Sequence, residues 1–329
     1  MNVQRYSDDF GGYLYLAGLK IPDYMSFQQA LLIVIGGPTG VGKTAFALRL
    51  AQQTGASILS ADSRQVFKEM PIGSAAPSAE ELAQVRHYFI GDRSISEPFN
   101  AGIFADEARQ LLKNSLFPKN PVQIVCGGSG LYLHALLHGL DQMPDVPPEI
   151  REQIGQLYQN GGIQALQNAL SMEDPEHLKK IDPQNPQRLM RALELIRASG
   201  MKIAEIHRQT GAALPYRSIF LALDLPREQL YGQINSRVIK MIEAGWIDEA
   251  RELLPYRSQN ALQTVGYKEL FEHFDGIRNL DETIRLIQQN TRRFAKRQLT
   301  WLRNKEKVHW IHPDTPVERI MQQIARGEI

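Results

Sequence analysis

The chain has 329 residues, of which 43 % are hydrophobic and 22 % are charged, and its net charge is +1 at pH 7. This length suffices for one large domain or two smaller ones, and the composition is that of an ordinary globular protein. Whole-molecule charge therefore does not predict a nucleic-acid partner, and the single cysteine excludes an intrachain disulfide or a cysteine zinc site.

The N-terminal residues 1–28 precede the first predicted strand, and we expect them to form an extension without chemistry of its own. The first nine residues have one arginine, two aspartates and no apolar core of signal-peptide length, and no run in the chain approaches the ~20 apolar residues of a membrane span. We therefore expect a cytoplasmic protein without a membrane partner.

The first predicted strand, Leu31–Ile35, leads into a complete phosphate-loop motif, and a predicted helix follows it. In such a loop, successive backbone N–H groups cradle phosphate oxygens, the lysine adds a positive charge, and the final hydroxyl is placed to hold Mg²⁺. The motif predicts binding of a di- or triphosphate without specifying the molecule. Its residues are Gly37, Pro38, Thr39, Gly40, Val41, Gly42, Lys43 and Thr44.

Short apolar runs alternate with helical patterns along the rest of the chain, which predicts a parallel sheet flanked by helices. The further predicted strands are Ser57–Ala61, Tyr88–Gly91, Val122–Cys126, Ser218–Leu223 and Val308–Ile311. The predicted helices are Thr44–Gln53, Ala101–Asn114, Leu131–His138, Gln187–Ala198, Arg227–Glu243 and Asp281–Asn304.

Two further strand ends carry candidate chemistry. Asp62 follows the second predicted strand, where a carboxylate either binds Mg²⁺ or acts as a general base, or else caps the next helix. Ser129 follows the fourth strand within a glycine-rich turn, where its hydroxyl either reaches a ligand or caps a helix. An ATPase would carry an acidic residue at this second position, so its absence argues against ATP hydrolysis.

The pattern changes between residues 144 and 214, where three prolines open a polar, helical segment without strand signals. We predict a P-loop NTPase-like α/β core formed by residues 29–143 and 215–329, interrupted by an inserted all-helical domain at 144–214. Within this insertion Arg188 and Arg191 are three residues apart and share a helix face.

The last long predicted helix is strongly basic. Between Arg285 and Lys305 it has seven bases and no acid, with Phe294 and Trp301 interleaved. This pattern suits a polyanion such as an RNA backbone, although a solvated basic helix face is the alternative interpretation.

Together these segments resemble the bacterial tRNA dimethylallyltransferases, also called tRNA isopentenyltransferases. The resemblance covers about Ile33 to Trp310, and its motifs occur in the family's order. They are the phosphate loop, Asp62–Phe67, Pro71–Pro77, Gly127–Tyr132, Asn185–Arg188, Val265–Glu269 and Thr291–Trp301.

The resemblance implies transfer of a dimethylallyl group from dimethylallyl diphosphate to N6 of the adenosine 3′-adjacent to the anticodon in tRNA. The phosphate loop would hold the diphosphate, Mg²⁺ would bind Thr44, Asp62 would take the amine proton, and Ser129 would contact the base or Asp62. We expect the protein to be a monomer, and the resemblance also implies the tRNA anticodon stem-loop as a partner. The residues expected to contact it are Asp62, Ser63, Arg64, Gln65, Gln187, Arg188, Leu189, Met190, Arg191, Arg292, Arg293, Lys296 and Arg297.

This chain departs from the family pattern at Ala76, where lysine is common, and at Gln263, where some relatives carry an arginine directed at the diphosphate. The sequence therefore leaves an arginine-type phosphate ligand unassigned. Three alternatives remain open: a small-molecule kinase using ATP, a nucleotide-gated RNA-binding protein, and an enzyme that prenylates free adenine nucleotides.

Overall fold

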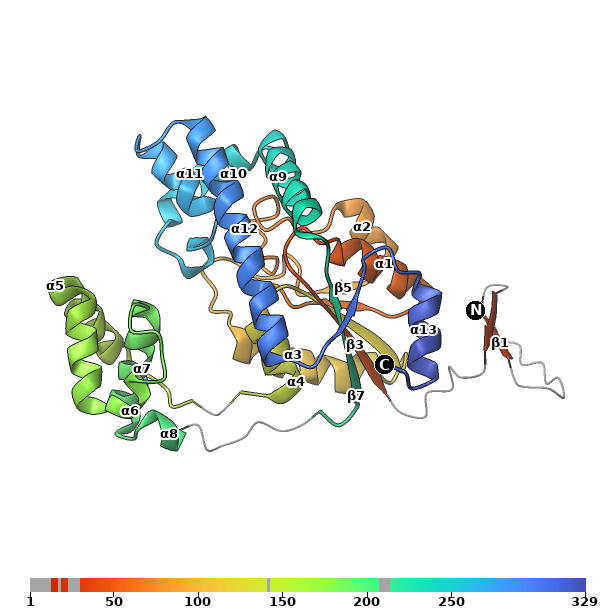
Figure 1. Ribbon diagram of the computed structural model, residues 1–329, viewed down its shortest axis with the longest axis horizontal. Coiled ribbons are helices and arrows are strands. Elements are labelled where there is room, and N and C mark those ends of the chain that lie inside the picture. Colours follow the sequence, from red (N-terminus) through yellow and green to blue (C-terminus); the bar gives the residue numbers. More distant parts are fainter. Residues whose placement is uncertain (1–12, 17–18, 23–29, 141–142, 207–213) are drawn as a thin grey trace. The chain divides into compact units, whose positions relative to one another are not determined.

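The computed structural model describes residues 13–16, 19–22, 30–140, 143–206 and 214–329 (Figure 1). The chain divides into two compact units, one comprising Met1–Leu137 with Leu214–Ile329 and the other His138–Ala213. Much of the predicted extension at 1–28 lies outside the described residues. Its described part is an antiparallel pair of strands, β1 (Tyr13–Leu16) and β2 (Leu19–Pro22).

The first unit is built on a six-stranded sheet in the order β5-β4-β6-β3-β7-β8, and every pairing within it is parallel. This confirms the predicted α/β fold and all six predicted strands. β5 ends before the predicted Gly91 because Phe89 and Gly91 adopt positive φ angles of 62° and 60°, which break the extended backbone. The strands are β3 (Leu31–Gly36), β4 (Ile58–Ser60), β5 (His87–Tyr88), β6 (Val122–Cys126), β7 (Arg217–Leu223) and β8 (His309–Ile311).

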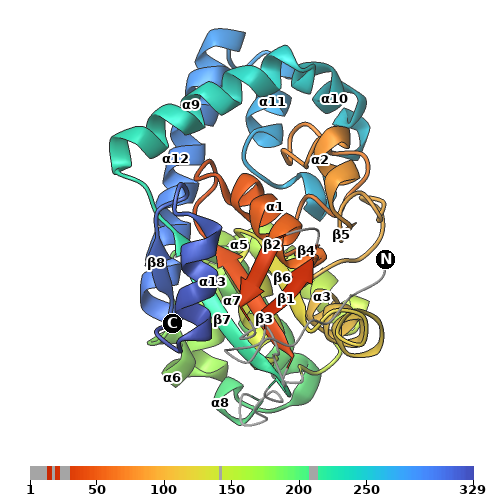
Figure 2. The same ribbon diagram turned by 90° about the vertical axis from the view of Figure 1, so that its right-hand side faces the viewer.

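Helices cover both faces of this sheet. All residues of β3 are buried although alternate side chains point to opposite sides, so both sides of the strand are covered. Leu32 and Val34 pack into a core with α3 (Ala101–Leu111) and α4 (Gly130–His138). Leu31, Ile33 and Ile35 point to the other side and pack with α1 (Lys43–Thr54) and α13 (Val317–Ala325). These two helices contact each other and lie close together in Figure 2.

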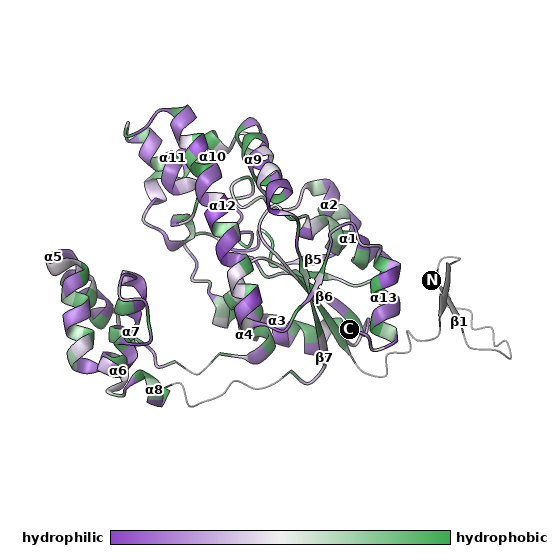
Figure 3. Ribbon diagram, viewed as in Figure 1, coloured by the Kyte–Doolittle hydropathy of each residue, from purple (hydrophilic) through white to green (hydrophobic). Residues whose placement is uncertain are grey.

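The hydropathy colouring follows these layers: the strands of the sheet are mostly hydrophobic and each helix mixes the two classes (Figure 3). Among the described residues, no helix combines the length and the apolar character that crossing a membrane requires.

Of the remaining helices of the first unit, α9, α10 and α11 lie beyond the carboxyl end of the sheet, whereas α12 runs from there down to the level of α3 (Figure 1). The two longest, α9 and α12, contact each other and carry residues of the site described below. They are α2 (Ala79–Gln84), α9 (Arg227–Glu243), α10 (Trp246–Glu252), α11 (Tyr267–Phe274) and α12 (Leu280–Lys305). Short π- and 3₁₀-helical turns occur at Leu112–Leu116, Leu254–Tyr256 and Asn260–Leu262.

The second unit is helical throughout its described residues and has its own apolar core. Asp174 helps to organise it, because its buried carboxylate accepts hydrogen bonds from the N–H groups of His177 (3.1 Å) and Ile203 (3.0 Å). The longest helix is interrupted at Gly162, which has φ 61° and ψ −160°. The helices are α5 (Pro148–Glu173), α6 (Pro175–Leu178), α7 (Pro186–Ser199) and α8 (Ile203–Ile206).

Candidate active site

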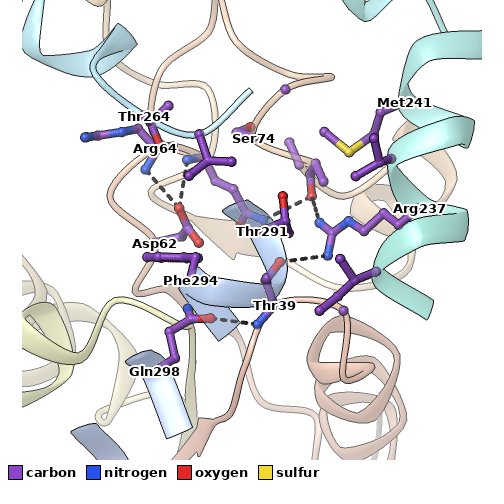
Figure 4. A pocket seen from close by; sticks show the side chains of 18 of the residues that line it. Thr39, Asp62, Arg64, Ser74, Arg237, Met241, Thr264, Thr291, Phe294 and Gln298 are labelled. Carbon is purple, nitrogen blue, oxygen red and sulfur yellow. Dashed lines mark hydrogen bonds between the residues drawn. The ribbon is translucent and has the colours of Figure 1, made fainter. Parts of the chain in front are cut away.

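A cavity of about 1040 Å³ opens at the carboxyl ends of β3, β4 and β6, where ligands bind in sheets of this kind. The phosphate loop, the segment after β4 and the glycine turn after β6 form its floor, and residues of α9 and α12 complete its walls. Figure 4 shows that Asp62, Arg237 and Gln298 approach this cavity from three different elements. All of these elements belong to the first unit.

The phosphate loop has the geometry of an anion site. Gly42 adopts φ 93° at the start of α1, a conformation that favours glycine, and no described side chain caps the helix. The uncapped N–H groups and the positive end of the helix dipole therefore face the cavity. Lys43 Nζ donates a hydrogen bond to the Pro38 carbonyl at 2.9 Å, and burial lowers the pKa of Lys43 to about 8.

Asp62 uses one carboxylate oxygen as a cap. Oδ1 accepts hydrogen bonds from the backbone N–H groups of Arg64 (2.9 Å) and Gln65 (3.4 Å). Among the residues that the structure describes, none donates to Oδ2, and Asp62 lines the cavity. The two roles that the sequence left open for Asp62 are therefore compatible, because one oxygen orients the side chain while the other remains available for chemistry.

Ser129 lies beside the backbone on either side of Asp62 because two chain segments approach each other closely. A Cβ atom on Gly127 would come within 2.1 Å of the Ala61 carbonyl oxygen, so only glycine permits the contact. The Ser129 N–H donates to that same carbonyl at 3.3 Å, and its Oγ accepts a hydrogen bond from the N–H of Ser63 at 3.0 Å. The hydroxyl proton of Ser129 is thus still able to donate to a neighbouring group.

Arg237, which the sequence analysis missed, is the cation on the α9 side of the cavity. It donates long hydrogen bonds to Thr39 Oγ1 (3.5 Å) and to the Ala75 carbonyl (3.4 Å). Burial lowers the pKa of Arg237, and the negative charge of Asp62 opposes that shift. The sequence around Arg237 shows only that it adjoins the apolar positions Ile234 and Val238, both buried in α9, and this does not indicate its partners.

Gln263 also lines the cavity, but its side-chain amide donates to the Arg257 carbonyl at 2.6 Å. Arg237 on α9, rather than a residue near Gln263, is therefore the candidate for the arginine-type ligand that the sequence left unassigned.

A second arginine, Arg64, contributes to the opposite wall. Burial lowers the pKa of Arg64, again opposed by Asp62, and Nη1 donates to the Ser63 carbonyl at 3.0 Å. Its buried Nε has no hydrogen-bond partner among the described residues. The neighbouring Gln65 amide is already engaged, since it donates to the Ala75 carbonyl at 3.1 Å.

The basic helix α12 distributes its predicted RNA contacts unevenly. Arg293, Lys296 and Arg297 are exposed, and Arg297 lies 5.6 Å from the centre of the Phe294 ring. Arg292 instead faces α9, where it donates to Asn235 Oδ1 at 2.6 Å. Arg292 therefore makes a packing contact with α9, and its RNA contact stays a prediction.

In the second unit, Gln187, Arg188 and Arg191 are exposed on α7, while Met190 is half-buried. The Leu189 side chain is fully buried in the core of that unit. We therefore leave Leu189 out of the proposed RNA-contacting surface.

Comparison with known proteins places the chain among its relatives. Residues 65–305 match the family model described as IPP transferase. The chain is 46 % identical to a tRNA dimethylallyltransferase of Cytophaga hutchinsonii over 88 % of its length and 95 % of the relative. It is 45 % identical to the enzyme of the same name from Christiangramia forsetii, over 89 % of this chain and 97 % of that one.

Solved structures agree with this comparison. A full-length tRNA isopentenylpyrophosphate transferase from Bacillus halodurans matches with a TM-score of 0.66 and 34 % identity, over 91 % of this chain and 96 % of that one. A eukaryotic dimethylallyltransferase described as acting on tRNA matches with a TM-score of 0.75 and 25 % identity, over 91 % and 79 %. The chain belongs to the IPP transferase family.

Proposed function

We propose that this protein transfers the dimethylallyl group of dimethylallyl diphosphate to N6 of the adenosine 3′-adjacent to the anticodon in tRNA. The observation that carries the proposal is the convergence of a phosphate loop, the Asp62 carboxylate and Arg237 on one cavity. The names of the relatives support the same reaction. The family motifs outside the phosphate loop, from Asp62–Phe67 to Thr291–Trp301, favour dimethylallyl transfer over the phosphoryl transfer of an ATP-dependent kinase.

In this proposal the diphosphate lies on the N-terminal end of α1. The loop N–H groups, Lys43 and Arg237 would neutralise the negative charge that develops as the carbon–oxygen bond breaks. The Thr44 hydroxyl, in the first turn of α1 and on the cavity wall, is an oxygen ligand of the kind Mg²⁺ prefers. When bound there, Mg²⁺ would neutralise part of the charge on the diphosphate oxygens.

The acceptor adenine must leave its stack to reach this cavity. Its N6 lone pair forms the new bond to C1 of the dimethylallyl group, and the electrons of the C1–O bond leave with the diphosphate. Asp62 Oδ2 takes the proton that N6 loses, while Oδ1 stays bound to the backbone. Ser129 can donate a hydrogen bond to the base or to the Asp62 carboxylate.

Two exposed surfaces are proposed to bind the RNA backbone, because lysine and arginine contacts to phosphates supply most nonspecific affinity. One consists of Arg293, Lys296 and Arg297 on α12. The other, in the second unit, consists of Gln187, Arg188 and Arg191 on α7. The proposed partner is the anticodon stem-loop, bound by a protein monomer.

The test is transfer of labelled dimethylallyl diphosphate to unmodified tRNA by the wild type and by Asp62→Asn. The asparagine oxygen can still accept the N–H bonds of Arg64 and Gln65, so the variant removes the base while keeping the cap. We expect a loss of roughly 10²- to 10⁴-fold in kcat with unchanged tRNA affinity. Asp92→Asn, outside the cavity, is the matched control.

If the wild type binds tRNA and diphosphate but transfers no dimethylallyl group, the proposed reaction is wrong. ATP turnover with a small-molecule acceptor would then favour the kinase alternative.

A further inference from the structure

We infer that Gln298 is a positioning residue that sets the phosphate loop against the turn carrying Ser129, an inference that rests on the proposed function. Gln298 lies in α12 and is 9 % exposed, whereas its neighbours Lys296 and Arg297 are exposed. Its Oε1 accepts a hydrogen bond from the Thr39 N–H at 2.8 Å, which Figure 4 shows. Its Nε2 donates to the Gly128 carbonyl at 2.8 Å.

These two hydrogen bonds join the half of the site that would bind the dimethylallyl donor to the half that would bind the acceptor base. On the donor side, Thr39 belongs to the phosphate loop, and its hydroxyl accepts the hydrogen bond from Arg237. On the acceptor side, Gly128 precedes Ser129, whose Oγ holds the backbone next to Asp62. A shift of the Gln298 amide would therefore change the distance between the diphosphate and the base.

The packing around the amide leaves it little freedom. A Cβ atom on Gly128 would lie 2.4 Å from Gln298 Nε2, and one on Gly130 would lie 2.4 Å from Trp301 Cδ2. Gln298 and Trp301 are three residues apart and share a face of α12, so the helix contacts the glycine turn at two positions about one helical turn apart. Backbone and side chain thus hold the amide between its two partners.

The residue type follows from these partners. A neutral amide offers one acceptor for the Thr39 N–H and one donor for the Gly128 carbonyl, which neither lysine nor glutamate can do. Replacing it with an apolar group would leave two backbone groups of the site unpaired. Unpaired buried groups are costly, so the loop would move to satisfy them.

The experiment compares the wild type with Gln298→Met, which keeps length and neutrality but makes no hydrogen bonds. We expect the Kd for inorganic diphosphate and the KM for dimethylallyl diphosphate to rise roughly 10- to 100-fold, with a lower kcat. The Kd for unmodified tRNA should change less than about twofold, because the exposed basic face is untouched. This split separates positioning from a general structural role.

Gln288→Met is the matched control, because Gln288 lies on the same helix but donates to the Asn235 carbonyl at 3.2 Å and, within the described part of the chain, makes no hydrogen bond to the phosphate loop. It should leave diphosphate binding unchanged. Gly128→Ala displaces the same amide from the other side and should weaken diphosphate binding in the same way. The double variant Gly128→Ala with Gln298→Met should lose less than the sum of the two.

The inference is overturned if Gln298→Met binds diphosphate like the wild type, or if Gln288→Met shows the same loss. Diphosphate binding is measured without transfer, so the two hypotheses are separable. A wild type that transfers no dimethylallyl group would contradict the proposed reaction, whereas a raised diphosphate Kd in Gln298→Met would still support the positioning role.

Discussion

The Tyr267 hydroxyl donates a 2.5 Å hydrogen bond to Oε1 of Glu249, which joins α11 to α10. The same carboxylate accepts the backbone N–H groups of Ile72 and Gly73, each at 2.8 Å. Burial raises the pKa of Tyr267, and the charge of Glu249 raises it further, so the hydroxyl stays a donor. This contact fixes a loop whose Ala75 carbonyl accepts from Arg237.

Glu249→Gln should therefore weaken both folding and diphosphate binding. The glutamine NH₂ group would face at least one of the three N–H and O–H groups that now donate to the carboxylate, and that group would lose its acceptor. We expect the free energy of unfolding to fall by about 2 kcal/mol in urea denaturation. The Kd for inorganic diphosphate should rise as the loop and Arg237 lose their fixed positions. Glu252→Gln, on the exposed side of α10, is the control and should change neither quantity.

Arg237→Gln should raise the Kd for diphosphate roughly 10- to 100-fold, because a charge-assisted contact to the phosphates would be lost. Isothermal titration calorimetry with inorganic diphosphate measures the effect directly. Arg227→Gln changes an exposed arginine on the same helix and should have no such effect. Unchanged affinity in Arg237→Gln would show that Arg237 serves the fold rather than the phosphate.

Diphosphate binding should depend on pH through Lys43, whose pKa burial lowers to about 8. The ammonium is charged below that pH, so affinity should be full below about 8 and decline as the pH rises through it. An arriving anion raises the pKa of Lys43, so binding at pH 8 to 8.5 should take up protons. Calorimetry in two buffers of different ionisation enthalpy measures that uptake.

Lys43→Met should abolish the part of the proton uptake that Lys43 contributes, leaving that of the diphosphate itself. The lysine also affects folding, since burial holds its pKa in the native state below the usual lysine value of 10.5. Its contribution to the free energy of unfolding should therefore increase as the pH rises from about 8 to 10.5. A pH-independent difference between wild type and variant would contradict the assignment.

Arg293 and Arg292 are adjacent on α12 but should respond differently to substitution. Arg293→Gln should weaken tRNA binding and reduce the slope of log Kd against log salt by roughly 0.7 to 0.9, the value for one phosphate contact. Arg292→Gln should mainly lower thermal stability, because Arg292 holds Asn235 on α9 at 2.6 Å. Filter binding over a salt series and thermal melts distinguish the two, and equal salt slopes would contradict the distinction.

Local patterns in the sequence were sufficient to predict the six strands, the phosphate loop and the position of Asp62 at a strand end. These features depend on hydrophobic periodicity and glycine spacing within a few residues, and such patterns are legible without knowing the packing. Periodicity also predicted the helix Gln187–Ala198, but not that Leu189 would be fully buried on it. That depends on which face of α7 meets the rest of its unit.

Arg237 and Gln298 could be assigned only from the tertiary structure. Their hydrogen bonds to Thr39 span 198 and 259 residues of sequence, respectively. Neither helix contains a local signal for the partner, because the contact exists only once α9 and α12 have packed beside the phosphate loop. The sequence by itself determined which backbone segments could bind a phosphate, and the packing of distant helices decided which side chains complete the site.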